Sequence, residues 1–86
     1  MSSDQTSLFD IKEIDGRKAR DILNEVYDSL EERGYNPTNQ IVGYLISGDP
    51  GYISSYNDAR KRIQEIERAK LVEILLDNFY NEEWDI

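Results

Sequence analysis

The chain has 86 residues, of which 33% are charged, and a formal net charge of −8, with neither cysteine nor histidine. One small domain with a thin stability margin is expected, and the missing residue types exclude disulfides, thiolate metal sites and the commonest metal ligand and general base. Because these residue types are missing, we expect no metal and no cofactor. The acidity disfavours nucleic acid and anionic membranes as partners. A second subunit is the remaining way to stabilise so small a domain.

Residues 1–16 mix small hydroxyl side chains with acids and contain few large apolar side chains, among them the adjacent pair Leu8 and Phe9. This composition predicts a flexible N-terminal tail. Its hydroxyls admit two interpretations: ordinary tail composition, or phosphorylation, which adds about −1.5 to −2 charges per site. The hydroxyl-bearing residues are Ser2, Ser3, Thr6 and Ser7.

The first predicted helix covers residues 17–33, where apolar residues recur at the spacing of one helical face. Asp15 suits an N-cap, and Gly34 stands where helices commonly end. The apolar positions of this face are Ala19, Ile22, Leu23, Val26, Tyr27 and Leu30.

The next stretch, GYNPTNQIVGYLISGDPGYI, contains a single charge. Asn36 followed by Pro37 predicts a capped helix start, and Gly48 predicts its stop. Asp49-Pro50 repeats the cap-then-proline pattern and predicts one further helical turn. Because this helix carries no charge, we expect it to be buried on most sides; its apolar positions are Ile41, Val42, Leu45 and Ile46.

A third helix is predicted from Asn57 or Asp58 to about Tyr80, and residues 81–86 form an acidic C-terminal tail. Its second half is apolar at nearly every angle, and a helix that is apolar all round is normally buried all round. Two short neighbours cannot cover such a helix, so we expect a homodimer. The apolar positions are Leu71, Val72, Ile74, Leu75, Leu76, Phe79 and Tyr80, and those assigned to the dimer interface are Leu71, Leu75, Leu76 and Phe79.

The predicted fold is therefore all-α. Residues 17–80 form a small bundle of three main helices and a short helical turn, which pairs into an intertwined homodimer with the tail of residues 1–16 outside it. No basic leader precedes an apolar core, and the longest apolar run is far too short to span a membrane, so a cytoplasmic location is expected.

Residues 57–70 carry a charge of +2, from five basic and three acidic side chains, in an otherwise acidic chain. This segment suits a docking face for an acidic partner, and an ordinary solvated face explains it equally well. The sequence YNDARKRIQEI also suits the DNA-reading helix of a helix-turn-helix module, which the overall acidity disfavours. The basic residues are Arg60, Lys61, Arg62, Arg68 and Lys70.

No catalytic constellation is found in the sequence. The stretch SGDPG lacks the Gly-Lys-Ser/Thr ending of a phosphate loop, and no serine has a histidine to activate it. Tyr35, Tyr44 and Tyr52 could line an aromatic ligand pocket, although tyrosines of this kind are more often core residues with a hydroxyl at the rim. A non-enzymatic protein is expected.

The string RGYNPTNQIVGYLISGDPGYI, followed by NDAR, Ile63 and the pair Glu67-Arg68, resembles the IreB/ReoM family of small regulatory phosphoproteins from Gram-positive bacteria. The resemblance covers roughly residues 17–80. It implies a small, helical, dimeric protein that is the substrate of a transmembrane Ser/Thr kinase with extracellular PASTA repeats and of a cognate phosphatase. It also implies a role in peptidoglycan synthesis and antibiotic tolerance, in some members through Clp-dependent turnover of the first committed enzyme.

The same resemblance implies functional positions. Asp4-Gln5-Thr6 matches the family's Asp-x-Thr acceptor context, so Thr6 is the main expected phosphoacceptor and Ser3 the second. Arg60 and Arg68 match basic positions that matter in the family.

The sequence departs from the family pattern in the same region. Ser55 and Gln64 stand where the family has arginines, and Arg68-Ala69-Lys70 replaces the usual Arg-Asp-Glu. Lys61, Arg62 and Lys70 keep the region basic. A protein partner in a proteolysis or cell-wall pathway is expected to dock here. The alternative is a helical adaptor or a helix-turn-helix nucleic-acid-binding module.

Overall fold

The computed structural model describes the backbone of residues 2–81 and the side chains of residues 16–81. This part of the chain is helical and contains no strand, which confirms the all-α prediction. Two short 3-10 turns, η1 and η2, lie between the second and third α-helices. The elements are α1 (Ser2–Glu32), α2 (Pro37–Ser47), η1 (Pro50–Tyr52), η2 (Tyr56–Asp58), α3 (Ala59–Ile63) and α4 (Arg68–Asn81).

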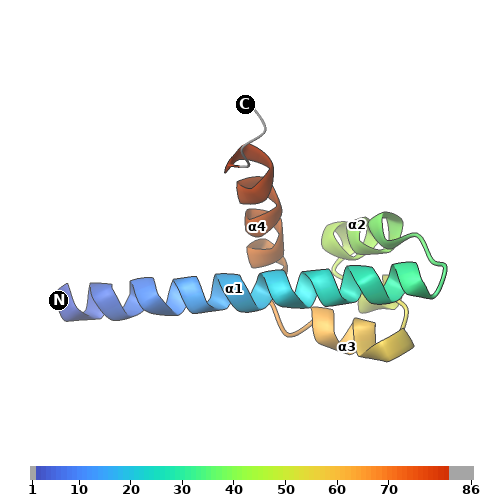
Figure 1. The fold of residues 1–86 in the computed structure, drawn as a ribbon, viewed down its shortest axis with the longest axis horizontal. Coiled ribbons are helices and arrows are strands. Elements are labelled where there is room, and N and C mark those ends of the chain that lie inside the picture. The colour runs from blue at the N-terminus through green and yellow to red at the C-terminus, as the bar shows by residue number, and fades with distance from the viewer. Residues whose placement is uncertain (1, 82–86) are drawn as a thin grey trace.

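Helix α1 is the axis of the molecule (Figure 1). Helices α2 and α3 flank its C-terminal half, and α4 rises from its middle at a steep angle. The expected start near residue 17 is wrong, because α1 begins at Ser2. The predicted flexibility of residues 1–16 stays a prediction, since the side chains of residues 1–15 lie outside the described part of the chain.

The end of α1 follows from local chemistry. Gly34 adopts a φ of 93°, in the left-handed region that a residue with a Cβ avoids. The N–H of Gly34 donates to the carbonyl of Glu31, and the N–H of Tyr35 donates to that of Leu30, both at 3.0 Å. These two bonds make a Schellman motif, which satisfies carbonyls that the helix leaves open.

Helix α2 starts and stops as predicted. The side chain of Asn36 accepts a bond from the N–H of Asn39 at 3.1 Å, and Pro37 is the first helical residue. Gly48, at φ 79°, ends the helix by donating to the carbonyl of Tyr44. Asp49 then accepts from the N–H of Gly51 at 2.8 Å and starts η1, so SGDPG is a helix stop and restart.

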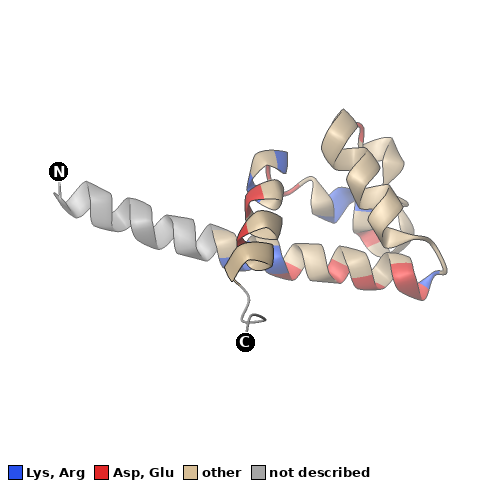
Figure 2. Ribbon diagram, turned by 90° about the horizontal axis from the view of Figure 1, so that it is seen from above, with Lys and Arg blue, Asp and Glu red and all other residues tan. Residues whose placement is uncertain are grey.

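The burial expected for α2 is wrong. Ile41 and Tyr44 are buried, but Val42 is 44% exposed and Ile46 is 80% exposed. The helix packs through one face only, so the absence of charge on α2, visible in Figure 2, does not reflect burial within the chain.

The single third helix predicted from Asn57 to Tyr80 is also wrong. The chain forms η2 and α3, breaks at residues 64–67 and starts again as α4. Ile63 before the break and Leu71 after it are both fully buried in the same core, so the chain interrupts the helix between two core residues.

The core draws on every helix. Ile22, Val26 and Leu30 form the buried stripe of α1 at the spacing that the sequence predicts. Residues from the other elements complete the cluster, namely Ile41, Tyr44, Ile53, Ala59, Ile63 and Leu71. Among the helices of the described part of the chain, none combines the length and hydrophobicity needed to span a bilayer.

Candidate docking faces

The basic segment predicted as a docking face is divided between α3 and α4. Two of its arginines donate hydrogen bonds to backbone carbonyls of other segments. Arg60 donates from Nε to the carbonyl of Ile53 at 2.8 Å. Arg68 donates from Nη1 to the carbonyl of Leu45 at 2.9 Å. The guanidinium of Arg68 also lies over Gly48, where a Cβ would come within 2.8 Å of Nη2. These two residues therefore have structural roles even though they are exposed.

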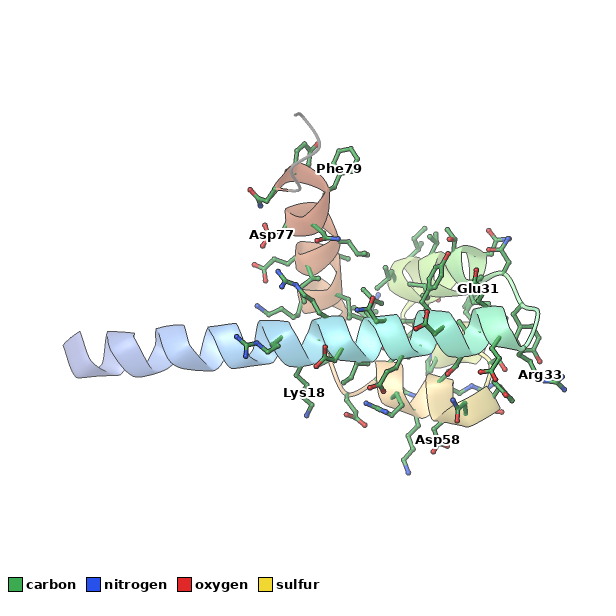
Figure 3. All side chains as sticks on the ribbon, viewed as in Figure 1. Lys18, Glu31, Arg33, Asp58, Asp77 and Phe79 are labelled. Atoms are coloured by element: carbon green, nitrogen blue, oxygen red, sulfur yellow. The ribbon has the colours of Figure 1, made fainter. Side chains whose placement is uncertain are left out.

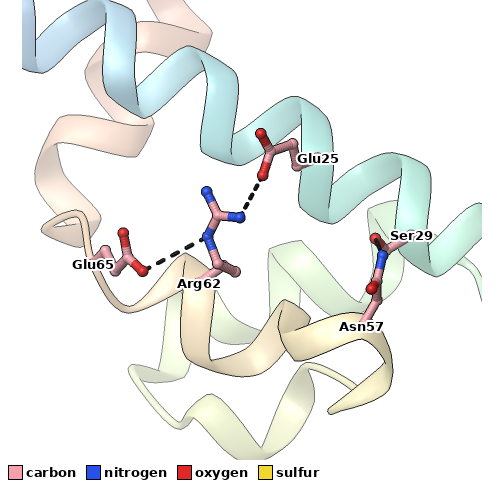
Figure 4. Close-up of polar contacts among 5 residues, drawn as sticks. All are labelled: Glu25, Ser29, Asn57, Arg62 and Glu65. Carbon is pink, nitrogen blue, oxygen red and sulfur yellow. Dashed lines mark hydrogen bonds and ion pairs between the residues drawn. The ribbon is translucent and has the colours of Figure 1, made fainter.

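Two further members of the segment form ion pairs within the chain. Arg62 contacts Glu25 of α1 at 2.6 Å and Glu65 at 3.6 Å (Figure 4), and Lys70 contacts Glu73 at 2.9 Å. The positive charge of this region is thus partly neutralised before any partner arrives. Lys61 lies exposed on α3.

Of the two positions where the resemblance led us to expect arginines, Gln64 lies within this segment and Ser55 lies just before it. Gln64 donates from its side-chain amide to the carbonyl of Arg60 at 3.0 Å, at the end of α3. Ser55 is exposed and directly precedes η2. Gln64 therefore supports the local backbone at a position where an arginine would present charge.

The sequence did not predict a polar contact that the structure shows between α1 and the η2 turn. Asn57 donates from Nδ2 to the hydroxyl of Ser29 at 2.9 Å, and Ser29 is buried; both residues are labelled in Figure 4. Asn57 and Asp58 both take left-handed backbone conformations, with φ of 56° and 61°. The only signal in the sequence was the Asn-Asp pair, since these residue types tolerate that conformation best.

A polar groove of about 430 Å³ lies between α1 and the η2–α3 segment. Its acidic lining comes from Glu25, Asp28, Glu32 and Asp58, with Arg62 opposite. Among the described side chains, no group of three or more acidic residues is placed to hold a metal ion.

An apolar groove of about 380 Å³ lies between α1, α2 and α4. Its floor and walls include Leu23, Ile41, Leu45 and Ile74, and polar side chains lie among them. The three tyrosines considered for an aromatic pocket line neither groove. Tyr44 is in the core, Tyr52 packs over Gly43, and Tyr35 is exposed.

Of the residues assigned to the dimer interface, Leu71, Leu75 and Phe79 share one stripe of α4 at a spacing of four residues, and Leu76 lies beside that stripe. Leu71 is fully buried in the core of its own chain, and Leu75 lines the apolar groove. Leu76 and Phe79 are 53% and 56% exposed, and Phe79 lies near the end of α4 remote from α1 (Figure 3). Their role in a dimer stays a prediction.

The expected phosphoacceptors Thr6 and Ser3 belong to the N-terminal part of α1. Their side chains lie outside the described part of the chain, so their assignment stays a prediction.

A comparison with known protein families identifies the family to which this chain belongs. A family model described as IreB regulatory phosphoprotein matches residues 4–81, which include Thr6, α1 from its third residue onward, the other three helices and the whole basic segment. Because this match covers most of the chain, the protein belongs to the IreB family of regulatory phosphoproteins.

Proposed function

We propose that this chain is a non-enzymatic regulator whose activity is set by phosphorylation of Thr6, with Ser3 as a second acceptor. The match to a regulatory phosphoprotein family over residues 4–81 is the observation that carries the proposal. The kinase would be a transmembrane Ser/Thr kinase of the PASTA type, opposed by a phosphatase. The regulated process would be peptidoglycan synthesis and antibiotic tolerance in the cytoplasm of a Gram-positive bacterium, with Clp-dependent turnover of the first committed enzyme as one route.

The position of Thr6 limits how its phosphate can act. Thr6 and Arg17 are eleven residues apart on α1, about 16 Å along the axis at 1.5 Å per residue. This separation exceeds the Debye length of about 8 Å at physiological salt. While α1 remains helical, a phosphate on Thr6 acts on a molecule that approaches the N-terminal part of α1, and it does not rearrange the ion pairs of the helical body.

The docking face for the downstream protein would combine that N-terminal part with the basic segment. Of the five basic residues, Lys61 on α3 is the best placed to meet an acidic partner. Arg60 and Arg68 are already bonded to backbone carbonyls, and Arg62 and Lys70 are already paired with acidic side chains. Loss of Lys61 should therefore weaken partner binding without loss of stability, whereas loss of Arg68 should reduce stability as well.

The test is to incubate the protein with a PASTA-type kinase and locate the phosphate by mass spectrometry. The proposal predicts modification of Thr6, strong loss of incorporation in Thr6→Ala, and a smaller loss in Ser3→Ala. Ser7→Ala is the matched control, because it removes a neighbouring hydroxyl outside the Asp-x-Thr context. Phosphate confined to residues 17–81 would contradict the proposal.

A further inference from the structure

The apolar groove between α1, α2 and α4 is uncovered within the described part of the chain. Val42 on α2 and Leu75 on α4 line it and are 44% and 42% exposed. Arg20 and Asn78 add polar groups to the same lining. The groove therefore offers an apolar slot with one cation beside it, which suits a short segment that carries both apolar and acidic side chains.

Residues 82–86, Glu-Glu-Trp-Asp-Ile, have that composition. In an extended segment, side chains alternate between two sides, so Trp84 and Ile86 face one way while Glu83 and Asp85 face the other. The apolar side matches the groove, and Arg20, an exposed residue of the lining, supplies a charge opposite to that of the acidic side. Trp84 is the single tryptophan of the chain.

The attachment point lies within reach of the groove. Asn81 is the last residue of α4, and Asn78, which lines the groove, precedes it by about 4.5 Å along the helix axis. Five extended residues span about 17 Å, so a segment that turns back at Asn81 can carry Trp84 alongside Asn78 and Leu75.

We propose that residues 82–86 fold back along α4 of the same chain and occupy this groove, with Trp84 as the apolar anchor and Arg20 as the partner of the acidic residues. This contact shares Leu75 with the expected dimer contact, and Phe79 lies one turn beyond Leu75 on the same stripe of α4. Leu76, in contrast, does not line the groove and lies on another side of the helix.

Trp84 fluorescence tests the proposal directly in the full-length protein. Selective excitation should give a short emission wavelength and weak acrylamide quenching, because the indole is shielded from water. Val42→Asn places a polar group in the groove and should shift the emission to longer wavelength and increase quenching. Ile46→Asn is the matched control, since Ile46 lies one turn along α2, is 80% exposed and does not line the groove.

A second pair of variants tests whether the charge of Arg20 contributes to the protection of Trp84. Arg20→Gln should weaken the protection of Trp84, whereas Lys18→Gln, on the same helix and outside the groove lining, should leave it unchanged. Far-ultraviolet circular dichroism should show native helicity in all four variants, because each replaced side chain is exposed. Quenching of wild-type Trp84 equal to that of the urea-unfolded chain, or equal effects of Val42→Asn and Ile46→Asn, would overturn the proposal.

A mixing experiment distinguishes docking of residues 82–86 into the groove of the same chain from docking into the groove of a second copy. Val42→Asn protein, which keeps Trp84, is unfolded and refolded with an excess of Trp84→Phe protein, which keeps an intact groove. Docking within one chain predicts that Trp84 stays as accessible as in Val42→Asn alone. Recovery of protection would mean that the segment enters the groove of a second copy and would overturn the same-chain assignment.

Discussion

The arginines of the basic segment have different structural roles. Arg68 donates to the carbonyl of Leu45, at the C-terminal end of α2, where a positive charge also interacts favourably with the helix dipole. Arg62 instead pairs with Glu25 across a half-exposed contact. Sequence reasoning grouped both as docking residues, because a bond between residues 23 positions apart leaves no local pattern.

This difference predicts unequal effects of removing each charge. Arg68→Gln should lower the free energy of unfolding by about 1–2 kcal/mol, through the loss of a charged hydrogen bond and of the dipole interaction. Arg62→Gln should cost less than about 1 kcal/mol, because exposed ion pairs contribute little. Urea unfolding of both variants measures the difference, and a larger cost for Arg62→Gln would refute these roles.

Gly43 supports the packing of an aromatic ring. A Cβ at this position would lie 2.5 Å from Cδ1 of Tyr52, so the ring would have to move. Gly43→Ala should destabilise the protein by about 1 kcal/mol or more, although alanine is intrinsically favoured in a helix by about 0.5–1 kcal/mol.

Thermal or urea unfolding provides the measurement for this contact, and Gly16→Ala is its control. No neighbouring atom lies within 4 Å of a Cβ at Gly16, so that substitution should stabilise α1. The cost of Gly43→Ala should disappear in a Tyr52→Ala background. An equal cost with and without Tyr52 would show that the ring is not the cause.

At the scale of elements, helix boundaries set by local chemistry were predictable and those set by packing were not. Asn36, Gly34 and Gly48 act within a few residues of themselves, so their sequence context predicts where α1 ends and where α2 starts and ends. The break between α3 and α4 lies between two core residues, Ile63 and Leu71. A periodic apolar pattern continues across that break and therefore hides it.

The η2 turn carries a prediction about backbone strain. Asp58 has a φ of 61° and makes no capping bond with its side chain, whereas Asn57 is bonded to Ser29. Asp58→Gly should raise the free energy of unfolding by about 0.5–1 kcal/mol, because glycine adopts this conformation without steric cost. Asn57→Gly should give no gain, since it also loses the bond to Ser29.

Chemical denaturation compares the two glycine variants. Asp58→Ala serves as a further control, because it keeps a Cβ in the left-handed region and should not stabilise the protein. Equal stability changes for Asp58→Gly and Asp58→Ala would remove strain as the explanation.

At the scale of the whole molecule, the apolar side of α4 is the strongest reason to expect a homodimer. Light scattering should give about twice the 10.1 kDa mass of the chain. Leu76→Glu should reduce this mass to that of one chain while helicity is retained, because the residue is exposed in the single chain and a buried, unpaired charge in an interface costs several kcal/mol.

Ile46→Glu is the matched control for the dimer, since it charges an exposed apolar position on α2. It should leave the doubled mass unchanged. A wild-type protein at the mass of one chain, or an undiminished mass for Leu76→Glu, would disprove the proposed interface.

The candidate site was predictable from the sequence only in outline. Composition marked the basic segment and the hydroxyls near Thr6, but neither indicated that Arg60 and Arg68 are bonded to distant carbonyls. The apolar groove joins residues of three helices far apart in the chain, so no sequence window contains it. Such features follow from tertiary packing, which helical periodicity alone does not specify.

The central claim is that a phosphate on Thr6 changes what the helical body binds. The most direct measurement is quantitative capture of partner proteins on wild-type protein phosphorylated by a PASTA-type kinase, on Thr6→Ala treated in the same way, and on Ser7→Ala as control. We predict that at least one cell-wall or proteolysis protein is retained differently by the phosphorylated wild type and by Thr6→Ala, while Ser7→Ala behaves as wild type. Identical sets of bound proteins on the phosphorylated wild type and on Thr6→Ala would contradict it.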